Sequence, residues 1–293
     1  MDLGKRALRF TFFSLWAVMM TALTYVVGAV GLKVIRREWG RLPYWSSGLA
    51  LSGLLYAGNL RPLGLAFLSL VLLIGIFSEI EEMGLSVMVS GFFTLLINAM
   101  LGAGTFALWV YYTGPKWSQQ LQDILQTMLK PLVDINPKLQ ISYYDLMLQL
   151  PSVVLILWMV AIYLAVWLEN RLAPNDSLTT KDQLSRVSMP DPVVWIFIIA
   201  LLGAFGGHGI GALEAMSVNI LNVCFVLFFF QGIAVVAKFF ESVRMGLFWQ
   251  FMFTVLIIVH LFLLVSLLGL IDYWVDFRSR IEKRGNQEMN RET

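Results

Sequence analysis

The sequence predicts an all-α protein: a polytopic transmembrane helical bundle that crosses the bilayer about eight times. Hydrophobic residues make up 58% and charged residues 14% of the 293-residue chain, whereas a soluble domain has about 45–50% and about 25%. Long stretches of the chain contain no charged residue. This is expected of membrane-spanning segments, because a charge at the bilayer centre costs about 2.5–3.5 kcal/mol. A water-soluble fold is therefore excluded.

Eight charge-free stretches define the predicted spans. A helix that crosses the bilayer needs roughly 20 residues, and this length is the standard for judging each stretch. The second and third are short and are separated only by Asn59-Leu60-Arg61-Pro62, which is a turn signal. They are either tilted short helices or a re-entrant pair that does not fully cross. The stretches are residues 10–32, 42–60, 62–78, 83–115, 146–168, 192–213, 215–237 and 245–271.

The first stretch follows Lys5 and Arg6, a charged start like that of a signal peptide. However, the apolar run is longer than the 7–15 residues of a cleaved signal, and it contains no clear A-x-A site. We therefore expect an uncleaved first helix.

The insert between the fourth and fifth spans, residues 112–145, has a different character. Apolar residues recur there at helical spacing among polar ones, which predicts an amphipathic helix. Pro131 is expected to end this helix, and Ser142 with Asp145 resembles a capping box that opens the next. The helix either lies in the membrane interface or packs on the protein's own loops.

The predicted domain organisation is a single transmembrane domain, residues 1–277, containing a polar loop at 169–191 and followed by a polar tail at 278–293. With eight crossings both termini share one side. That side holds more lysine and arginine than the other, although the Lys33–Arg41 run opposes this trend. The positive-inside rule then predicts cytoplasmic termini in the inner membrane of a bacterial cell.

Composition also bounds the function. A net charge of +2 gives no basic surface for nucleic acid, and the single cysteine, Cys224, excludes an internal disulfide. Two histidines, His208 and His260, are too few for a zinc or iron–sulfur cluster, so no metal or cofactor is predicted. Catalytic motifs such as H-E-x-x-H, the Walker loop and G-x-S-x-G are absent. We predict that the chain is not an enzyme, and an intramembrane enzyme is the third-ranked alternative.

The first group of candidate ligand-binding residues lies on the predicted fourth span. Small and polar residues recur there at steps of four, which places them on one stripe of a helix. Such a stripe serves either close helix packing or the lining of a ligand site, for which Thr94 and Asn98 are the candidates. The stripe comprises Ser86, Ser90, Thr94, Asn98 and Gly102.

The second group lies around the sixth and seventh spans. Five glycines between 203 and 211 surround His208, and Glu214 follows. Unwound backbone at membrane depth lines a cavity or is buried in protein, which makes His208 and Glu214 candidates, with a plain turn as the alternative. The amides of Asn222 and Gln231 must also find partners inside hydrocarbon. Glu79, Glu81 and Glu82 are interpreted as a solvated turn, with a cation site as the alternative.

Three short segments carry a family resemblance. Phe230-Gln231-Gly232, the run from Leu268 to Asp272, and Asp276-Phe277-Arg278 resemble the YybS-like family of uncharacterised bacterial membrane proteins. The chain is more distantly similar to the S subunits of energy-coupling-factor vitamin transporters and to MreD-type scaffold proteins. The transporter resemblance implies a small-molecule cavity and a partner subunit. The first span departs from it because residues 10–32 lack the A-x-x-x-A row with which S subunits dock.

These observations lead to one hypothesis and its rival. The leading one is a transporter-like, small-molecule-binding subunit that acts within a larger membrane assembly, with the bilayer, a small ligand and a membrane protein as partners. The rival is a non-catalytic scaffold or assembly subunit.

Overall fold

Helices account for nearly all of the residues that the computed structural model describes, and turns join them. The described residues are 3–135, 142–172, 191–206, 211–243, 245–277 and 279–281. The chain divides into two compact units, unit 1 (residues 1–180) and unit 2 (residues 181–293). Most of the predicted polar loop and tail lies at residues 173–190 and 282–293, outside the described part. That both units belong to one transmembrane domain stays a prediction.

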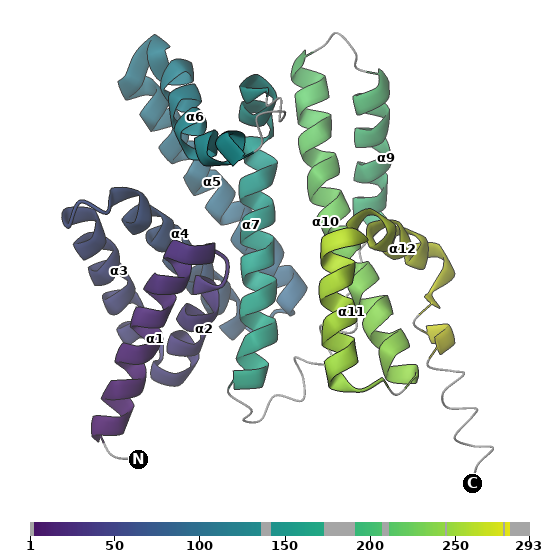
Figure 1. The fold of residues 1–293 in the computed structure, drawn as a ribbon, viewed down its shortest axis with the longest axis horizontal. Coiled ribbons are helices and arrows are strands. Elements are labelled where there is room, and N and C mark those ends of the chain that lie inside the picture. The colour runs from purple at the N-terminus through teal and green to yellow at the C-terminus, as the bar shows by residue number, and fades with distance from the viewer. Residues whose placement is uncertain are drawn as a thin grey trace. The chain divides into compact units, whose positions relative to one another are not determined.

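Unit 1 is a bundle of helices that cross one another at several angles (Figure 1). Its centre is formed by α2 and α4, which contact each other, and both contact α1, α3 and α7. The elements are α1 Leu3–Thr24, α2 Gly28–Trp39, α3 Arg41–Ala57, α4 Arg61–Glu82, α5 Val87–Thr113, the short 3₁₀ helix η1 Gly114–Lys116, α6 Trp117–Ile135 and α7 Tyr143–Leu172.

The predicted first span, residues 10–32, is wrong as one continuous helix. α1 ends at Thr24, and the backbone turns at Tyr25, which has a φ of 54°. α2 then runs back beside α1. The ion pair between Arg9 Nη2 and Glu38 Oε1, at 2.7 Å, shows that the end of α2 lies beside the start of α1. The start of α1 and the end of α2 are therefore at the same end of unit 1. The predicted placement of the Lys33–Arg41 run on the side opposite the N-terminus is wrong for the same reason.

α2 is short and almost completely enclosed. Its 12 residues make a helix of about 18 Å, well short of the roughly 30 Å of a bilayer core. Nine consecutive residues, Gly28 to Arg36, are buried, so the helix has no outward face over this length. Glycine permits the close packing: a Cβ at Gly31 would lie 2.8 Å from the Trp16 ring.

The predicted short second and third spans correspond to α3 and α4, with 17 and 22 residues. The turn expected around residues 59–62 is confirmed, since Asn59 has a φ of 63° and α4 begins at Arg61 with a proline in its first turn. The two helices pack closely. Tyr44 is 1% exposed, and its hydroxyl donates a 2.7 Å hydrogen bond to Val71 O.

The insert contains the predicted amphipathic helix, α6, but Pro131 does not end it. The helix continues to Ile135 with Pro131 inside it. The predicted start of α7 is confirmed: Asp145 N donates a 3.3 Å hydrogen bond to Ser142 Oγ, as in a helix cap. Ile124, Met128 and Ile135 of α6 are exposed, and contact of this helix with the membrane interface stays a prediction.

Unit 2 contains α9 Asp191–Gly206, α10 Gly211–Ser242, α11 Leu247–His260 and α12 Phe262–Val275 (Figure 1). The predicted span 245–271 is wrong as one helix, because it breaks at Leu261 into α11 and α12, each with 14 residues. α10 is the central helix and contacts the other three. Where α10 and α12 meet, a Cβ on Gly269 would lie 1.9 Å from Phe228 O.

Within the described residues, five helices are long and apolar enough to cross a membrane: α1, α4, the stretch beginning with α5, α7 and α10. α9 and α12 are shorter apolar helices. The chain is thus an all-helical membrane protein with several apolar helices, as expected from its composition. The count of eight crossings stays a prediction.

Candidate functional site

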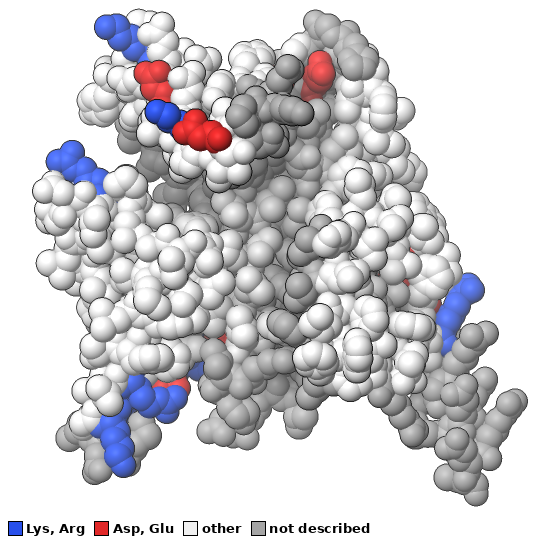
Figure 2. All heavy atoms as spheres, viewed as in Figure 1, with Lys and Arg blue, Asp and Glu red and all other residues white. Residues whose placement is uncertain are grey.

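Ionised side chains gather where α1 and α3 begin and where α2, α4 and α7 end. We call this region the charged end of unit 1. On the face shown in Figure 2, charged side chains of unit 1 lie mainly towards its ends, with uncharged residues between. The ion pairs at the charged end are Arg9–Glu38, Lys33–Glu81, Arg36–Glu79, Arg36–Glu82, Arg37–Glu169 and Arg41–Glu79.

Lys33 of α2 is the most enclosed lysine of this region, with a side chain 5% exposed. Its ammonium donates hydrogen bonds to the Glu81 carboxylate and, at 3.2 Å, to Ser78 Oγ. It also lies 4.8 Å from the centre of the Phe77 ring, a geometry in which the ring's negative face attracts a cation. All three partners are on α4, so Lys33 holds α2 to α4.

Arg36, three residues further along α2, is 4% exposed. Its Nη2 lies 2.8 Å from Glu82 Oε2 and 3.3 Å from Glu79 Oε1, again on α4. Its Nε is buried and has no hydrogen-bond acceptor among the described residues. A buried donor without an acceptor costs about 1–3 kcal/mol.

Glu79 is the point at which three helices meet. Besides Arg36 of α2, its Oε1 accepts a 3.1 Å hydrogen bond from Trp45 Nε1 of α3 and lies 2.9 Å from Arg41 Nε. The prediction of a solvated turn is wrong for Glu79, which is in α4 and only 20% exposed. Glu82 is 59% exposed, so the network reaches from the core to the surface.

A second polar group lies at the start of α2, at the opposite end of this helix from the charged end. The Tyr25 hydroxyl lies 2.7 Å from Ser69 Oγ of α4 and accepts a 3.1 Å hydrogen bond from Trp158 Nε1 of α7. Ser69 is eight residues into α4, and Trp158 is near the middle of the 30-residue α7. The turn before α2 is therefore partly buried beside the middle part of α7, and α2 runs from there to the charged end.

Thr94 and Asn98, predicted as ligand-binding residues, are brought together on the buried stripe of α5. Thr94 Oγ1 donates to Ser90 O at 2.7 Å, and Asn98 Nδ2 donates to Thr94 O at 2.9 Å. These two and Ser90 are the buried residues of α5, so the stripe faces its neighbours. Hydrogen bonds along the helix agree with the packing alternative, and a ligand-lining role stays a prediction.

The unit 2 candidates are not brought to one point. Glu214, Asn222 and Gln231 are all on α10. Asn222 and Gln231 are nine residues apart, which at 100° per residue places them on opposite faces. His208 lies outside the described residues. Because Thr94 and Asn98 belong to the other unit, one cavity shared by all six residues stays a prediction.

Gln231 has a defined structural role. It is 1% exposed, and its Nε2 donates a 3.1 Å hydrogen bond to Oδ2 of Asp272, which is 3% exposed. Asp272 Oδ1 accepts a 2.9 Å hydrogen bond from Phe277 N. The polar pair joins α10 to α12 beside the glycine contact of Gly269.

Sequence reasoning missed the charged end, although a signal was present. Lys33 and Arg36 are three apart, as are Glu79 and Glu82, so each pair shares one helix face. Both pairs border long apolar stretches. Two such faces of opposite charge are complementary, and in the structure they meet where the parallel helices α2 and α4 both end.

A family model described as "Predicted membrane protein (DUF2232)" matches residues 44–273, from α3 to α12. The chain belongs to this family. No curated protein and no solved structure matches the chain. The match supports an uncharacterised membrane protein family, and the resemblance to YybS-like proteins, S subunits and MreD-type proteins stays a prediction.

Proposed function

We propose that this DUF2232 protein is a transporter-like membrane subunit that binds a small polar solute and acts within a larger assembly. The observation that carries the proposal is α2, a half-length helix enclosed in the bundle with two buried cations at its end. Helices interrupted at membrane depth are characteristic of transporters, where the break lies beside the substrate or ion.

The surroundings of α2 support this role. Its first residues follow the partly buried turn at Tyr25, where Ser69 and Trp158 supply polar groups. Its last residues meet the exposed carboxylate of Glu82. A solute entering at the charged end would pass ion pairs that can exchange partners, and would offer an acceptor to the unpaired Nε of Arg36.

A scaffold without a solute is the second candidate, and a specific observation favours it. Asn98 and Gln231, the polar groups singled out in the sequence, both make hydrogen bonds within or between helices. In a scaffold these groups would only hold helices together. An intramembrane enzyme ranks third.

The charged end also supports an orientation. Within the described part of unit 1, Arg61, Lys116 and Lys130 lie on the segments that join the other ends of the helices. By the positive-inside rule, we place the charged end in the cytoplasm and the N-terminus with it. The lysines and arginines of the charged end are Lys5, Arg6, Arg9, Lys33, Arg36, Arg37 and Arg41.

Cysteine accessibility tests the proposal without a known substrate. In a Cys224→Ala background, Ser69→Cys places a thiol beside the start of α2, and Ser52→Cys places one at a buried site on α3 that serves as the control. In native membrane vesicles, a charged, water-soluble thiol reagent should label Ser69→Cys at least about tenfold faster than it labels Ser52→Cys. Equal, slow labelling of the two, with full labelling of both after denaturation, would overturn the transporter proposal in favour of the scaffold.

A further inference from the structure

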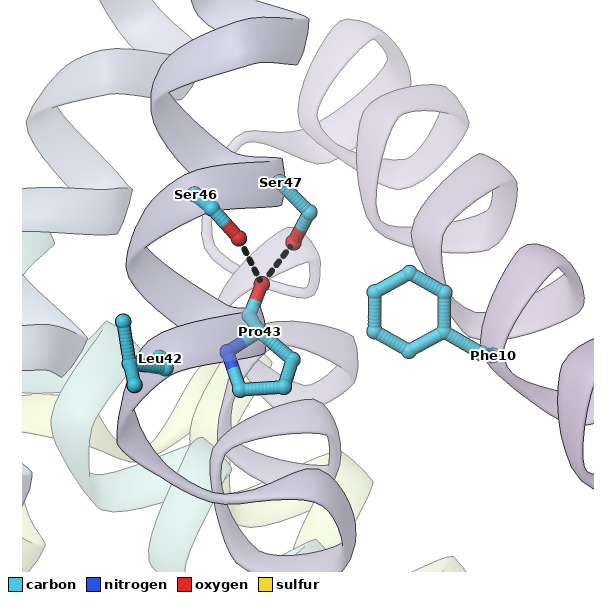
Figure 3. Close-up of a pocket in the computed structure, with 5 residues that line it drawn as sticks. All are labelled: Phe10, Leu42, Pro43, Ser46 and Ser47. Atoms are coloured by element: carbon cyan, nitrogen blue, oxygen red, sulfur yellow. Dashed lines mark hydrogen bonds between the residues drawn. The ribbon is translucent and has the colours of Figure 1, made fainter.

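A shallow depression lies between α1 and α3 at the charged end. It is lined by Phe10 of α1 and by Leu42, Pro43, Ser46 and Ser47 of α3. In Figure 3, the Phe10 ring faces Pro43 across the depression, and both serine side chains point to Pro43 O. Their hydroxyls donate to that carbonyl at 3.3 and 2.6 Å. The lining is thus mainly apolar, with two hydroxyl oxygens deeper along α3.

Basic side chains border this depression at its outer end on both helices. Arg41 immediately precedes Leu42 and is 70% exposed, and Arg9 immediately precedes Phe10 and is 47% exposed. Arg6 is exposed and is one turn before Phe10, on the same side of α1. From the end of the bundle inwards, the order is therefore guanidinium groups, then an apolar lining.

We infer that this depression binds an anionic diacyl phospholipid from the leaflet at the charged end. The order of the groups matches such a lipid: phosphate beside the arginines, then acyl chain along Phe10, Leu42 and Pro43. The depression is an open, mainly apolar surface on a membrane protein, and lipid is the molecule that such a surface meets.

The arginines remain able to bind a phosphate while paired. Arg9 contacts Glu38, and Arg41 contacts Glu79 through Nε. A guanidinium has five N–H donors, so each retains donors for phosphate oxygens. Arg6 is exposed and adds a positive charge. A zwitterionic lipid would bring its own cation to the same place, so the arginines favour a headgroup with a net negative charge.

Native mass spectrometry of the full chain tests the inference. The protein is released from nanodiscs that contain equal amounts of phosphatidylcholine and phosphatidylglycerol with identical chains, and the retained lipids are counted. We expect phosphatidylglycerol to be enriched, by about fivefold for each arginine that contacts the headgroup. Arg6→Gln and Arg41→Gln should each lower the enrichment by that factor, whereas Ser46→Trp, which fills the depression, should abolish retention.

Lys116→Gln and Lys130→Gln are matched controls, since both remove an exposed positive charge remote from the depression. They should leave the enrichment unchanged. Among the described residues Arg6 forms no ion pair, so Arg6→Gln tests the headgroup contact without removing a pair that holds helices together. Equal retention of the two lipids by the unchanged protein would overturn the inference. So would a loss of phosphatidylglycerol enrichment in the lysine controls equal to the loss in the arginine variants. Undiminished lipid retention in Ser46→Trp would also overturn it. None of these outcomes bears on labelling at Ser69, so the two proposals fail separately.

Discussion

The side-chain amide of Gln231 donates a 3.1 Å hydrogen bond to the carboxylate of Asp272, 41 residues further along the chain. The bond joins α10 to α12 and links two of the segments in which the family resemblance was recognised, residues 230–232 and 268–272. Those short sequence patterns therefore correspond to one helix crossing. Gly232 and Gly269 allow the backbones to approach, and the polar pair fixes their register.

The glycine contact predicts a steric effect. Gly269→Ala would place a Cβ 1.9 Å from Phe228 O, a backbone atom that cannot rotate away. We expect the free energy of unfolding to fall by at least about 3 kcal/mol, which is the upper end of the usual cost of overpacking a core. A lower Tm in detergent would report this loss. Gly91→Ala is the control, because its Cβ would meet nothing within 4 Å, and it should match or exceed the parent Tm.

The polar pair predicts an asymmetry between two substitutions. Asp272→Asn keeps a side-chain oxygen for Phe277 N, and the Gln231 amide can turn to present its oxygen instead, so the cost should be under about 1 kcal/mol. Asp272→Leu leaves the Gln231 amide and Phe277 N without this acceptor and should cost about 2–4 kcal/mol. Thermal unfolding of both variants checks this. Equal Tm values would show that the hydrogen bonds contribute nothing to stability.

The charged end predicts a second asymmetry. Lys33→Met leaves Glu81 unpaired, but Glu81 is 31% exposed and can be solvated. Glu81→Gln instead leaves the buried ammonium of Lys33 without its carboxylate and should be more destabilising, by about 1–2 kcal/mol relative to Lys33→Met. The double variant should recover part of that loss. Chemical denaturation of all three measures the coupling, and additive losses would contradict a direct pair.

The hairpin formed by α1 and α2 predicts a topology that differs from a simple eight-span arrangement. In the Cys224→Ala background, Lys5→Cys and Arg37→Cys should both be protected from an impermeant thiol reagent applied to intact cells. Arg61→Cys should react, because α3 carries the chain to the other end of unit 1. If Arg37→Cys reacted while Lys5→Cys did not, residues 10–32 would cross the membrane once, and the hairpin would be wrong.

The amphipathic helix predicts contact with lipid at the interface. Ile124 and Met128 are four residues apart on one face of α6 and are 49% and 71% exposed. A spin label at Met128→Cys should collide more with oxygen than with a polar nickel complex. The reverse is expected at Gln126→Cys, about 160° round the helix. Equal accessibility at the two sites would support a helix packed only on the protein's own loops.

The sequence was sufficient to predict the elements that have local signals. Proline after Asn59 marks the turn between α3 and α4, and Ser142 marks the start of α7. The breaks at Tyr25 and Leu261 were missed because neither residue is a glycine or proline and neither is charged. Both lie inside apolar runs, where hydropathy reports burial in lipid but not the direction of the chain.

The site was harder to predict than the fold because its partners are distant in sequence. Glu81 is 48 residues from Lys33, and Glu169 is 132 residues from Arg37. Spacing within one helix cannot show which distant helix will face it. The sequence correctly indicates that Gln231 needs a partner. It does not identify Asp272 as that partner, because Asp272 is 41 residues away and follows the last predicted span, residues 245–271.

The dependence of α2 on α4 also has a consequence for biosynthesis. Arg36 is made 43 residues before Glu79, and Lys33 is made 48 residues before Glu81. When α1 first enters the membrane, the two cations of α2 have no acidic partner on α4 and remain in contact with water. α2 can therefore reach its final position only after α4 has been made. We expect the protein to assemble in two steps, with α1 inserted first and α2 drawn into the bundle as α4 arrives.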